Sequence, residues 1–168
     1  MITTSTEYAE KLWLLQSRTP PRKAILPKAE KIYNIDLKTR QIDAPEFLSV
    51  LKDHNAESIY FSVSRFLDYM DLAETTCVIQ YKLPNGKAGM YQVPFYDITT
   101  YNTPGAEKLI FPWLLSGEVT SFTGDVEYSI RFFSVEDVTI NPSEKKFRFL
   151  YNLNTLPAVG KILYGMDV

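Results

Sequence analysis

The sequence has few side chains that could carry out nucleophilic or acid–base chemistry. Among its 168 residues are one cysteine, Cys77, and one histidine, His54. Cys77 lies in the apolar run Thr-Thr-Cys-Val-Ile, which is typical of a buried structural thiol rather than of a nucleophile. His54 lies between Asp53 and Asn55, in a segment typical of a turn. We therefore expect neither residue to be catalytic.

Carboxylates are the other candidates for chemistry, since a pair held about 5–9.5 Å apart across a sugar-sized cleft could hydrolyse a glycosidic bond. Acidic residues gather in two places, which are Asp68, Asp71 and Glu74, and Glu136 and Asp137. No pattern indicates a cleft, and solvated loop acids explain both groups. The sequence also lacks a Gly-x-Ser-x-Gly elbow and a glycine-rich phosphate loop. We predict no enzymatic activity, no cofactor and no bound metal.

Composition excludes several other classes of function. A single cysteine and a single histidine rule out a disulfide framework and an ordinary zinc or haem site. The 18 Lys and Arg residues against 20 Asp and Glu residues leave no cationic excess to neutralise a phosphate backbone, so nucleic-acid binding is not expected. Apolar runs are only a few residues long, and the N-terminus lacks the pattern of a secretory signal, so no membrane association is expected either.

The elements that position these residues are mostly strands. Tyr, Phe and Trp make up 14% of the chain, and aromatic residues favour strands. From residue 32 onward apolar residues alternate with polar ones, and turn residues recur at short intervals. About seven strands follow Phe47, which predicts a mostly β chain with an immunoglobulin-like antiparallel β-sandwich over residues 32–168. The Cys…Trp…Cys spacing of true immunoglobulin domains is missing, so the pattern predicts the architecture alone.

Individual strands and hairpins follow from the same alternation. The most regular strand is 125–133, where Val126, Tyr128, Ile130 and Phe132 share one face. Pro84-Asn85-Gly86 is the clearest turn, and Pro94 implies an edge position or a bulge. The predicted strands are 32–37 with 40–43, 47–51 with 58–64, 75–81 with 89–98, then 109–115, 125–133 and 146–151.

Residues 1–31 form a separate region, which we predict to be a helix followed by an extended arm. Thr4 and Glu7 have the spacing of a capping box, and the helix extends from Glu7 to near Ser17. A helix this short is marginal alone, so its apolar surface must lie on the chain's own body or on a neighbouring chain. The arm, 19–31, is rich in proline and stiff. It is either strapped over the sandwich or reaches another subunit.

The residues predicted to contact a partner are apolar or are prolines of this N-terminal region. They are Tyr8, Leu12, Trp13, Leu15, Pro20 and Pro21. An alternative function is carbohydrate binding or host adhesion by the β-sandwich, because sandwich domains with surface aromatics can stack sugars on them. The aromatic residues that could form such a platform are Tyr91, Phe95, Tyr96, Tyr101 and Trp113.

Several segments resemble known proteins. The stretches 7–13, 16–21, 32–37, 44–50 and 151–157 resemble small proteins encoded in the structural-gene regions of tailed phages and prophages. The stretch Thr120-x-Phe122-x-Gly124-x-Val126-x-Tyr128-Ser129-Ile130-Arg131-Phe132 is similar to the sandwich module at the N-terminus of phage baseplate upper proteins. Neither resemblance brings catalytic residues with it.

The resemblance implies a non-enzymatic virion component, made in the cytoplasm of the bacterial host, in the tail, baseplate, neck or a head-attached assembly. Its partners would be other virion proteins and copies of itself. A homo-oligomer in a symmetric assembly is expected, because particle proteins repeat around closed rings. A stiff arm that carries an amphipathic helix would suit contact with a neighbouring subunit.

Overall fold

The computed structural model describes residues 5–18, 22–23, 32–55, 57–99 and 107–164. Within them lie one α-helix, thirteen strands and a 3₁₀ turn at Leu72–Glu74. The elements are α1 (Ser5–Arg18), β1 (Arg22–Lys23), β2 (Ile32–Ile35), β3 (Phe47–Val50), β4 (Ser58–Ser64), β5 (Phe66–Leu67), β6 (Met70–Asp71), β7 (Thr76–Lys82), β8 (Ala88–Gln92), β9 (Phe95–Thr99), β10 (Lys108–Leu114), β11 (Gly124–Asp137), β12 (Phe147–Asn154) and β13 (Ala158–Leu163). A mostly β chain with an N-terminal helix is confirmed.

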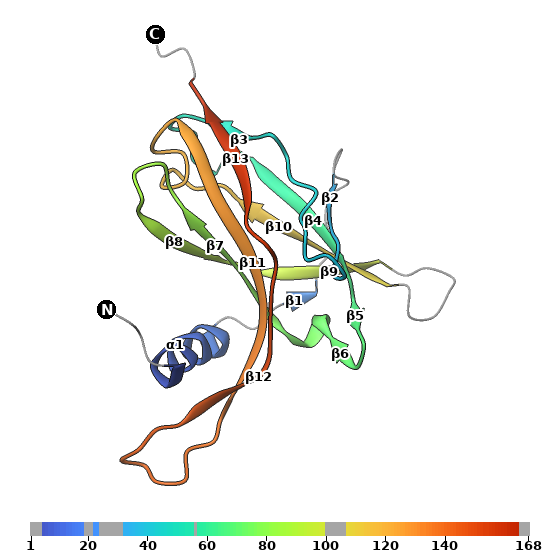
Figure 1. Cartoon of the computed structure of the whole chain (residues 1–168), viewed down its shortest axis with the longest axis vertical. Helices are drawn as coiled ribbons and strands as arrows, with labels where there is room; N and C mark the ends of the chain where they lie inside the picture. The colour runs from blue at the N-terminus through green and yellow to red at the C-terminus, as the bar shows by residue number, and fades with distance from the viewer. Residues whose placement is uncertain (1–4, 19–21, 24–31, 56, 100–106, 165–168) are drawn as a thin grey trace.

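Two sheets form the body of the chain (Figure 1). The first has the strand order β1-β9-β10-β4-β2, and the second has the order β3-β13-β11-β7-β8, with β12 also paired to β11. Both sheets are mixed, because β1–β9, β2–β4 and β3–β13 run parallel. The prediction of a purely antiparallel sandwich is therefore wrong, and the immunoglobulin-like strand order is not confirmed.

The space between the sheets is filled by large aromatic side chains. Trp113, Phe61 and Phe111 from the first sheet and Tyr128 and Phe132 from the second are all fully buried. The ring centroids of Trp113 and Tyr128 lie 5.0 Å apart, and those of Phe111 and Phe132 lie 5.8 Å apart. The high aromatic content of the sequence thus supplies the core, where aromatic pairs add to the gain from buried area.

The predicted hairpin at 47–64 is wrong in its pairing, and the one at 32–43 is confirmed only close to its turn, where the Asp36 amide donates to the Gln41 carbonyl at 2.9 Å and the Asp43 amide donates to the Asn34 carbonyl at 2.8 Å. Most of β2 instead pairs in parallel with β4, and an antiparallel Ile35–Ile42 bridge joins its end to the next segment. Strands β3 and β4 lie in different sheets, because the chain between them crosses from one sheet to the other. At this crossing Lys52 and Asn55 have positive φ, and their backbone amides donate to the carbonyls of Thr120 and Leu115 at 2.9 Å.

The hairpin β7–β8 is confirmed at the predicted turn. Gly86 has a φ of 88°, which a residue with a side chain rarely adopts, and the Leu83 amide donates to the Lys87 carbonyl at 2.8 Å. The predicted second strand of this hairpin is in fact two strands. It breaks at Pro94, between β8 and β9, where the chain leaves one sheet and enters the other.

The longest strand, β11, organises the second sheet. Strands β13 and β12 pair successively along the same edge of it, at 124–128 and 131–137. Thr155 marks the junction, since its hydroxyl accepts from the Ile130 amide at 2.8 Å and its amide donates to the Ile130 carbonyl at 2.9 Å. Strand β13 was not predicted, and β11 extends four residues beyond the predicted end at residue 133. The added length makes the β11–β12 hairpin project beyond the body (Figure 1).

Gly89 of β8 lies directly under the ring of Tyr81 on the neighbouring strand. A Cβ at this position would overlap that ring, which is fixed by a hydrogen bond from its hydroxyl to Glu118 Oε2 at 3.0 Å. We therefore predict that Gly89→Ala lowers the free energy of unfolding by about 1–3 kcal/mol, measured by denaturant titration. The exposed neighbour provides the control, since Ala88→Ser should change it little. Equal stability of the two variants would mean that the ring swings aside freely.

Candidate interaction surface

Cys77 and His54, the candidate nucleophile and the candidate base, both have structural roles in the fold. Cys77 is fully buried on β7, and burial raises the pKa of its thiol well above the usual value. His54 Nδ1 accepts a hydrogen bond from the Gly117 amide at 2.8 Å, which joins two loops. The Cys77 thiol is therefore out of reach of solvent, and one ring nitrogen of His54 is engaged by a backbone amide.

Three of the candidate carboxylates form ion pairs or hydrogen bonds with nearby residues. Asp71 forms a two-point ion pair with Arg65 at 3.0 Å and accepts from the Ala73 amide. Glu136 pairs with Arg148 across the β11–β12 hairpin. Hydrogen bonds from Thr139 lower the pKa of Asp137. The described residues contain no group of three or more His, Cys, Asp and Glu that could hold a metal, and their one α-helix is too short and too polar to span a membrane.

The predicted aromatic platform for sugars is wrong for the two residues on which it most depended. Trp113 is fully buried and Tyr96 is 3% exposed. The Tyr96 hydroxyl donates to the Thr75 carbonyl at 3.1 Å inside the body. Tyr91 is half-buried against the same core, and Tyr101 lies outside the described residues. Aromatic residues at alternating strand positions here form the core between the sheets.

Helix α1 lies on the outer face of the second sheet, where it covers a second, smaller apolar cluster. Ala9 and Leu12 are buried there together with residues of β7, β11 and β12, namely Val78, Phe133, Val135 and Phe147. Tyr8, Trp13 and Leu15 pack around the margin, and the rings of Trp13 and Phe147 lie 5.2 Å apart. Four of the residues predicted to contact a partner therefore contact their own chain in the structure, namely Tyr8, Leu12, Trp13 and Leu15.

The rest of the predicted N-terminal arm is described only at Arg22 and Lys23. These two residues form β1, which pairs in parallel with Phe95 and Tyr96 of β9 in the same chain. Pro20 and Pro21 lie outside the described residues, as does the predicted domain boundary at residue 31. The described part of the arm thus lies along the chain's own body.

Polar contacts fix the helix in one position on the sheet. Gln16 Oε1 accepts from the Val135 amide at 3.2 Å, and Gln16 Nε2 donates to the Val135 carbonyl at 3.5 Å. The Tyr8 hydroxyl accepts from Gln80 Nε2 at 2.8 Å, and the Arg131 guanidinium lies 4.9 Å from the centre of the Tyr8 ring. Apolar packing alone is non-directional, so it is these directional contacts that define the position of α1 along the strands.

Gln16 forms hydrogen bonds with the Val135 amide and carbonyl of β11, beyond the last residue of β11 that pairs with β7, Phe133. We predict that Gln16→Ala lowers the free energy of unfolding by about 1–2 kcal/mol, because it leaves the partly buried Val135 amide and carbonyl without this partner. Hydrogen exchange should accelerate most at the Val135 amide. Exchange that rises equally at all amides would instead indicate a global loss of stability with no local role for Gln16.

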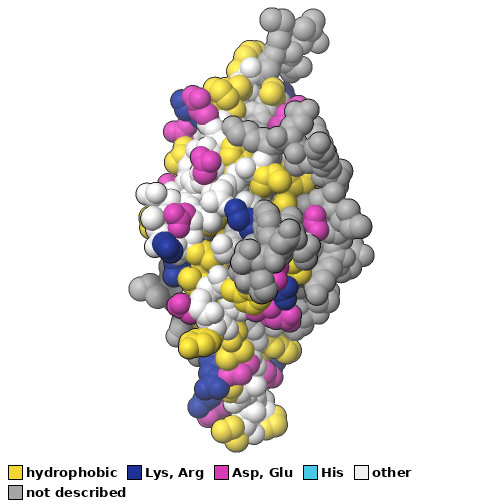
Figure 2. Space-filling model, turned by 90° about the vertical axis from the view of Figure 1, so that its right-hand side faces the viewer, with side chains coloured by type: hydrophobic (Ala, Val, Ile, Leu, Met, Phe, Trp, Pro, Cys, Tyr) yellow, Lys and Arg dark blue, Asp and Glu magenta, His cyan; other side chains and the backbone are white. Residues whose placement is uncertain are grey.

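The β11–β12 hairpin projects past the helix and carries an apolar side chain at its tip. Ile140 is 95% exposed, and the tip is shaped by Asn141, whose side chain accepts from the Ser143 amide at 3.2 Å. Lys145 lies 3.9 Å from Glu10 of α1, which joins the hairpin to the helix. Figure 2 shows the narrow lower end of the molecule, where hydrophobic atoms reach the tip next to charged side chains.

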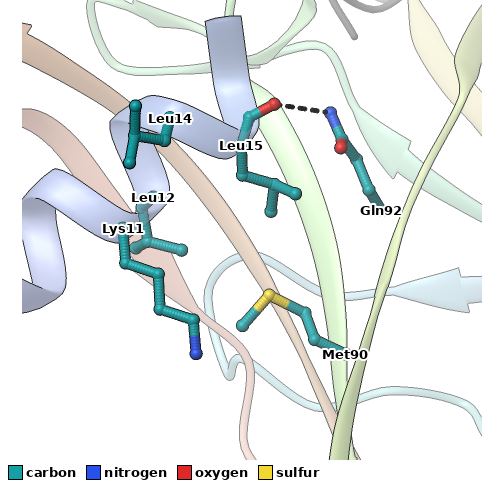
Figure 3. Close-up of a pocket in the computed structure, with 6 residues that line it drawn as sticks. All are labelled: Lys11, Leu12, Leu14, Leu15, Met90 and Gln92. Carbon is teal, nitrogen blue, oxygen red and sulfur yellow. Dashed lines mark hydrogen bonds between the residues drawn. The ribbon is translucent and has the colours of Figure 1, made fainter. Parts of the chain in front are cut away.

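A groove lies between α1 and β8, on the outer face of the second sheet (Figure 3). It encloses about 350 Å³ and is lined by Lys11, Leu12, Leu14, Leu15, Met90 and Gln92. Gln92 Nε2 donates to the Leu15 carbonyl at 3.4 Å, which connects the strand to the end of the helix. Leu14 is 51% exposed. The helix and the strand thus form one mostly apolar surface.

Three residues of the groove and the hairpin tip were not predicted from the sequence, namely Met90, Gln92 and Ile140. Met90 and Gln92 lie in a segment predicted as a strand, and their place in the groove follows from the position of β8 as the last strand of its sheet among the described residues. Ile140 lies in the predicted loop at 136–145. An isoleucine in a polar loop that contains Asn-Pro could have indicated an exposed apolar contact residue.

Comparisons with known proteins include a weak structural similarity. No protein-family model matches the chain, and no curated protein matches it significantly. The solved N-terminal domain of phage TP901-1 ORF48 superposes with a TM-score of 0.39 and 8% sequence identity, over 80% of this chain and 97% of the other.

Proposed function

We propose that this chain is a non-enzymatic structural component of a tailed-phage particle and acts through protein–protein contacts. The sequence stretches that resemble phage and prophage structural proteins support the phage assignment. The proposed location is the virion, after synthesis in the cytoplasm of the bacterial host. The proposed partners are other virion proteins and further copies of this chain.

The observation that carries a contact function is the projecting β11–β12 hairpin. A polar loop would suffice to close a hairpin, yet this one presents Ile140 almost entirely to solvent. The base of the hairpin is held by α1 through the Trp13–Phe147 ring contact and the two Gln16–Val135 hydrogen bonds. A braced projection with an apolar tip loses little conformational entropy when it enters a neighbouring protein.

Purified particles of the phage or prophage that encodes the chain provide the test. Mass spectrometry should find the chain in these particles at a fixed ratio to the other structural proteins. Ile140→Asp should lower its incorporation, because a charge at the tip opposes burial in a partner. The matched control is Val159→Asp, since Val159 is 49% exposed and lies on β13, away from the hairpin. Particles that lack the wild-type chain would contradict the proposal.

A further inference from the structure

We propose that the hydrogen bond between His54 and Gly117 is a pH-sensitive latch, which joins two loops at neutral pH and releases the loop around Gly117 when His54 takes up a proton. His54 is the single histidine of the chain. Imidazole is the side chain whose charge ordinarily changes between about pH 5 and 8. The latch is a conformational device within the chain and goes beyond the proposed function, on which it does not depend.

The latch lies where the chain passes twice between the two sheets. The segment that contains His54 leads from β3 in the second sheet to β4 in the first, and the loop that contains Gly117 leads back from β10 to β11. The ends of this Gly117 loop are held independently of His54. The Asn55 amide donates to the Leu115 carbonyl and the Lys52 amide donates to the Thr120 carbonyl, both at 2.9 Å. Loss of the latch therefore frees the middle of the loop and leaves its ends in place.

The geometry of the bond requires a neutral imidazole ring. The Gly117 amide donates to His54 Nδ1 at 2.8 Å. A ring nitrogen that accepts a hydrogen bond carries no proton, so the proton of the neutral ring lies on Nε2. A second proton has to bind at Nδ1, where it would meet the N–H group of Gly117 in place of a lone pair. The proton and the Gly117 amide thus compete for one nitrogen atom.

Close packing and exposure of the ring favour this switch. A Cβ at Gly117 would lie only 3.3 Å from His54 Nδ1 and 3.5 Å from its Cβ, so the ring lies directly against the Gly117 backbone. Two N–H groups that point at each other at this distance must separate. The His54 side chain is exposed, so protons reach it from solvent and the ring has room to turn away.

Four charged residues lie on the two segments that meet at the latch, namely Lys52, Asp53, Glu57 and Glu118. The acidic groups attract a charged ring and the lysine repels it. Glu118 also connects the Gly117 loop to the β7–β8 hairpin, because it accepts from the Tyr81 hydroxyl at 3.0 Å and lies 3.4 Å from Lys87. All these groups remain in the variants of His54 described below, so a comparison of those variants isolates the imidazole.

Hydrogen exchange of the full chain, followed by nuclear magnetic resonance at about pH 7.5 and pH 5.5, tests the latch. Rates are corrected for the intrinsic dependence of exchange on pH. Protection of the Gly117 amide is expected to fall by about fivefold or more at the lower pH, the effect of one lost hydrogen bond. The amides of Lys52 and Asn55, which hold the ends of the loop, should keep their protection.

Two variants show whether the imidazole causes the change. His54→Ala removes the acceptor, so Gly117 should be weakly protected at both pH values, with no further fall. In His54→Asn the side-chain oxygen can accept from the same amide at any pH, so protection should persist at the lower pH. A wild type in which Gly117 keeps its protection at the lower pH would overturn the proposal. An equal fall in the wild type and in His54→Ala would overturn it as well, because the sensitivity to pH would then have another origin.

Discussion

Trp113→Ala is expected to lower the free energy of unfolding by about 3–5 kcal/mol. Trp113 is fully buried between the sheets, where its ring lies 5.0 Å from that of Tyr128 and 6.1 Å from that of Tyr81. Truncation removes the largest buried side chain and leaves a cavity that two neighbouring strands cannot close. Because domains are usually stable by only about 5–15 kcal/mol, the loss takes a large part of the total.

Chemical denaturation followed by far-ultraviolet circular dichroism measures this loss. Tyr69→Ala is the control, since Tyr69 is fully exposed and its removal should cost little. The experiment also separates the two functions considered for the aromatic residues. A Trp113→Ala variant that keeps its stability and loses affinity for a sugar would restore the platform hypothesis and contradict the buried position.

Leu12→Asp is expected to release α1 from the sheet and to cost about 3 kcal/mol or more. Leu12 is fully buried among Val78, Phe133 and Val135, so an aspartate there would be removed from water into an apolar cluster. The cost cannot exceed the free energy with which the helix docks, because a larger penalty is relieved when the helix detaches. The two-sheet body should remain folded, since the larger core lies on the opposite face of the second sheet.

Fluorescence of Trp13 reports on this release. The chain has two tryptophans, and in a Trp113→Phe background Trp13, which packs against Phe147, is the only one left. Its emission should shift to longer wavelength in the Leu12→Asp variant. Leu14→Asp is the matched control, because Leu14 is half-exposed on the same helix. An unchanged emission in both variants would mean that α1 is not held by Leu12.

Much of the fold was predictable because the periodicity of a strand reports which of its faces is buried. The pattern Val126, Tyr128, Ile130, Phe132 identified the inner face of β11, and Pro84-Asn85-Gly86 identified a real turn. The parallel pairs at the sheet edges were not predictable in this way. A strand that joins an edge after a long connection leaves no local turn signature, and β2 and β3 both do so.

The candidate surface was less predictable than the fold. The amphipathic pattern of residues 7–17 showed that a helix must be covered, but periodicity does not identify what covers it, and here it is the outer face of the chain's own sheet. Alternating aromatics are equally compatible with a core and with an exposed platform. Met90 and Gln92 became candidates because β8 is the last strand of its sheet within the described part of the chain, and that position depends on which strands pair rather than on local sequence.

The proposed function requires the braced hairpin tip to contact another protein of the particle. A photo-reactive amino acid in place of Ile140, in particles assembled with that variant, tests it most directly. Irradiation is predicted to join the tip to one virion protein, while the same group in place of Tyr69 gives no such product. Incorporation into particles with no cross-link from the tip to any protein would contradict the claim.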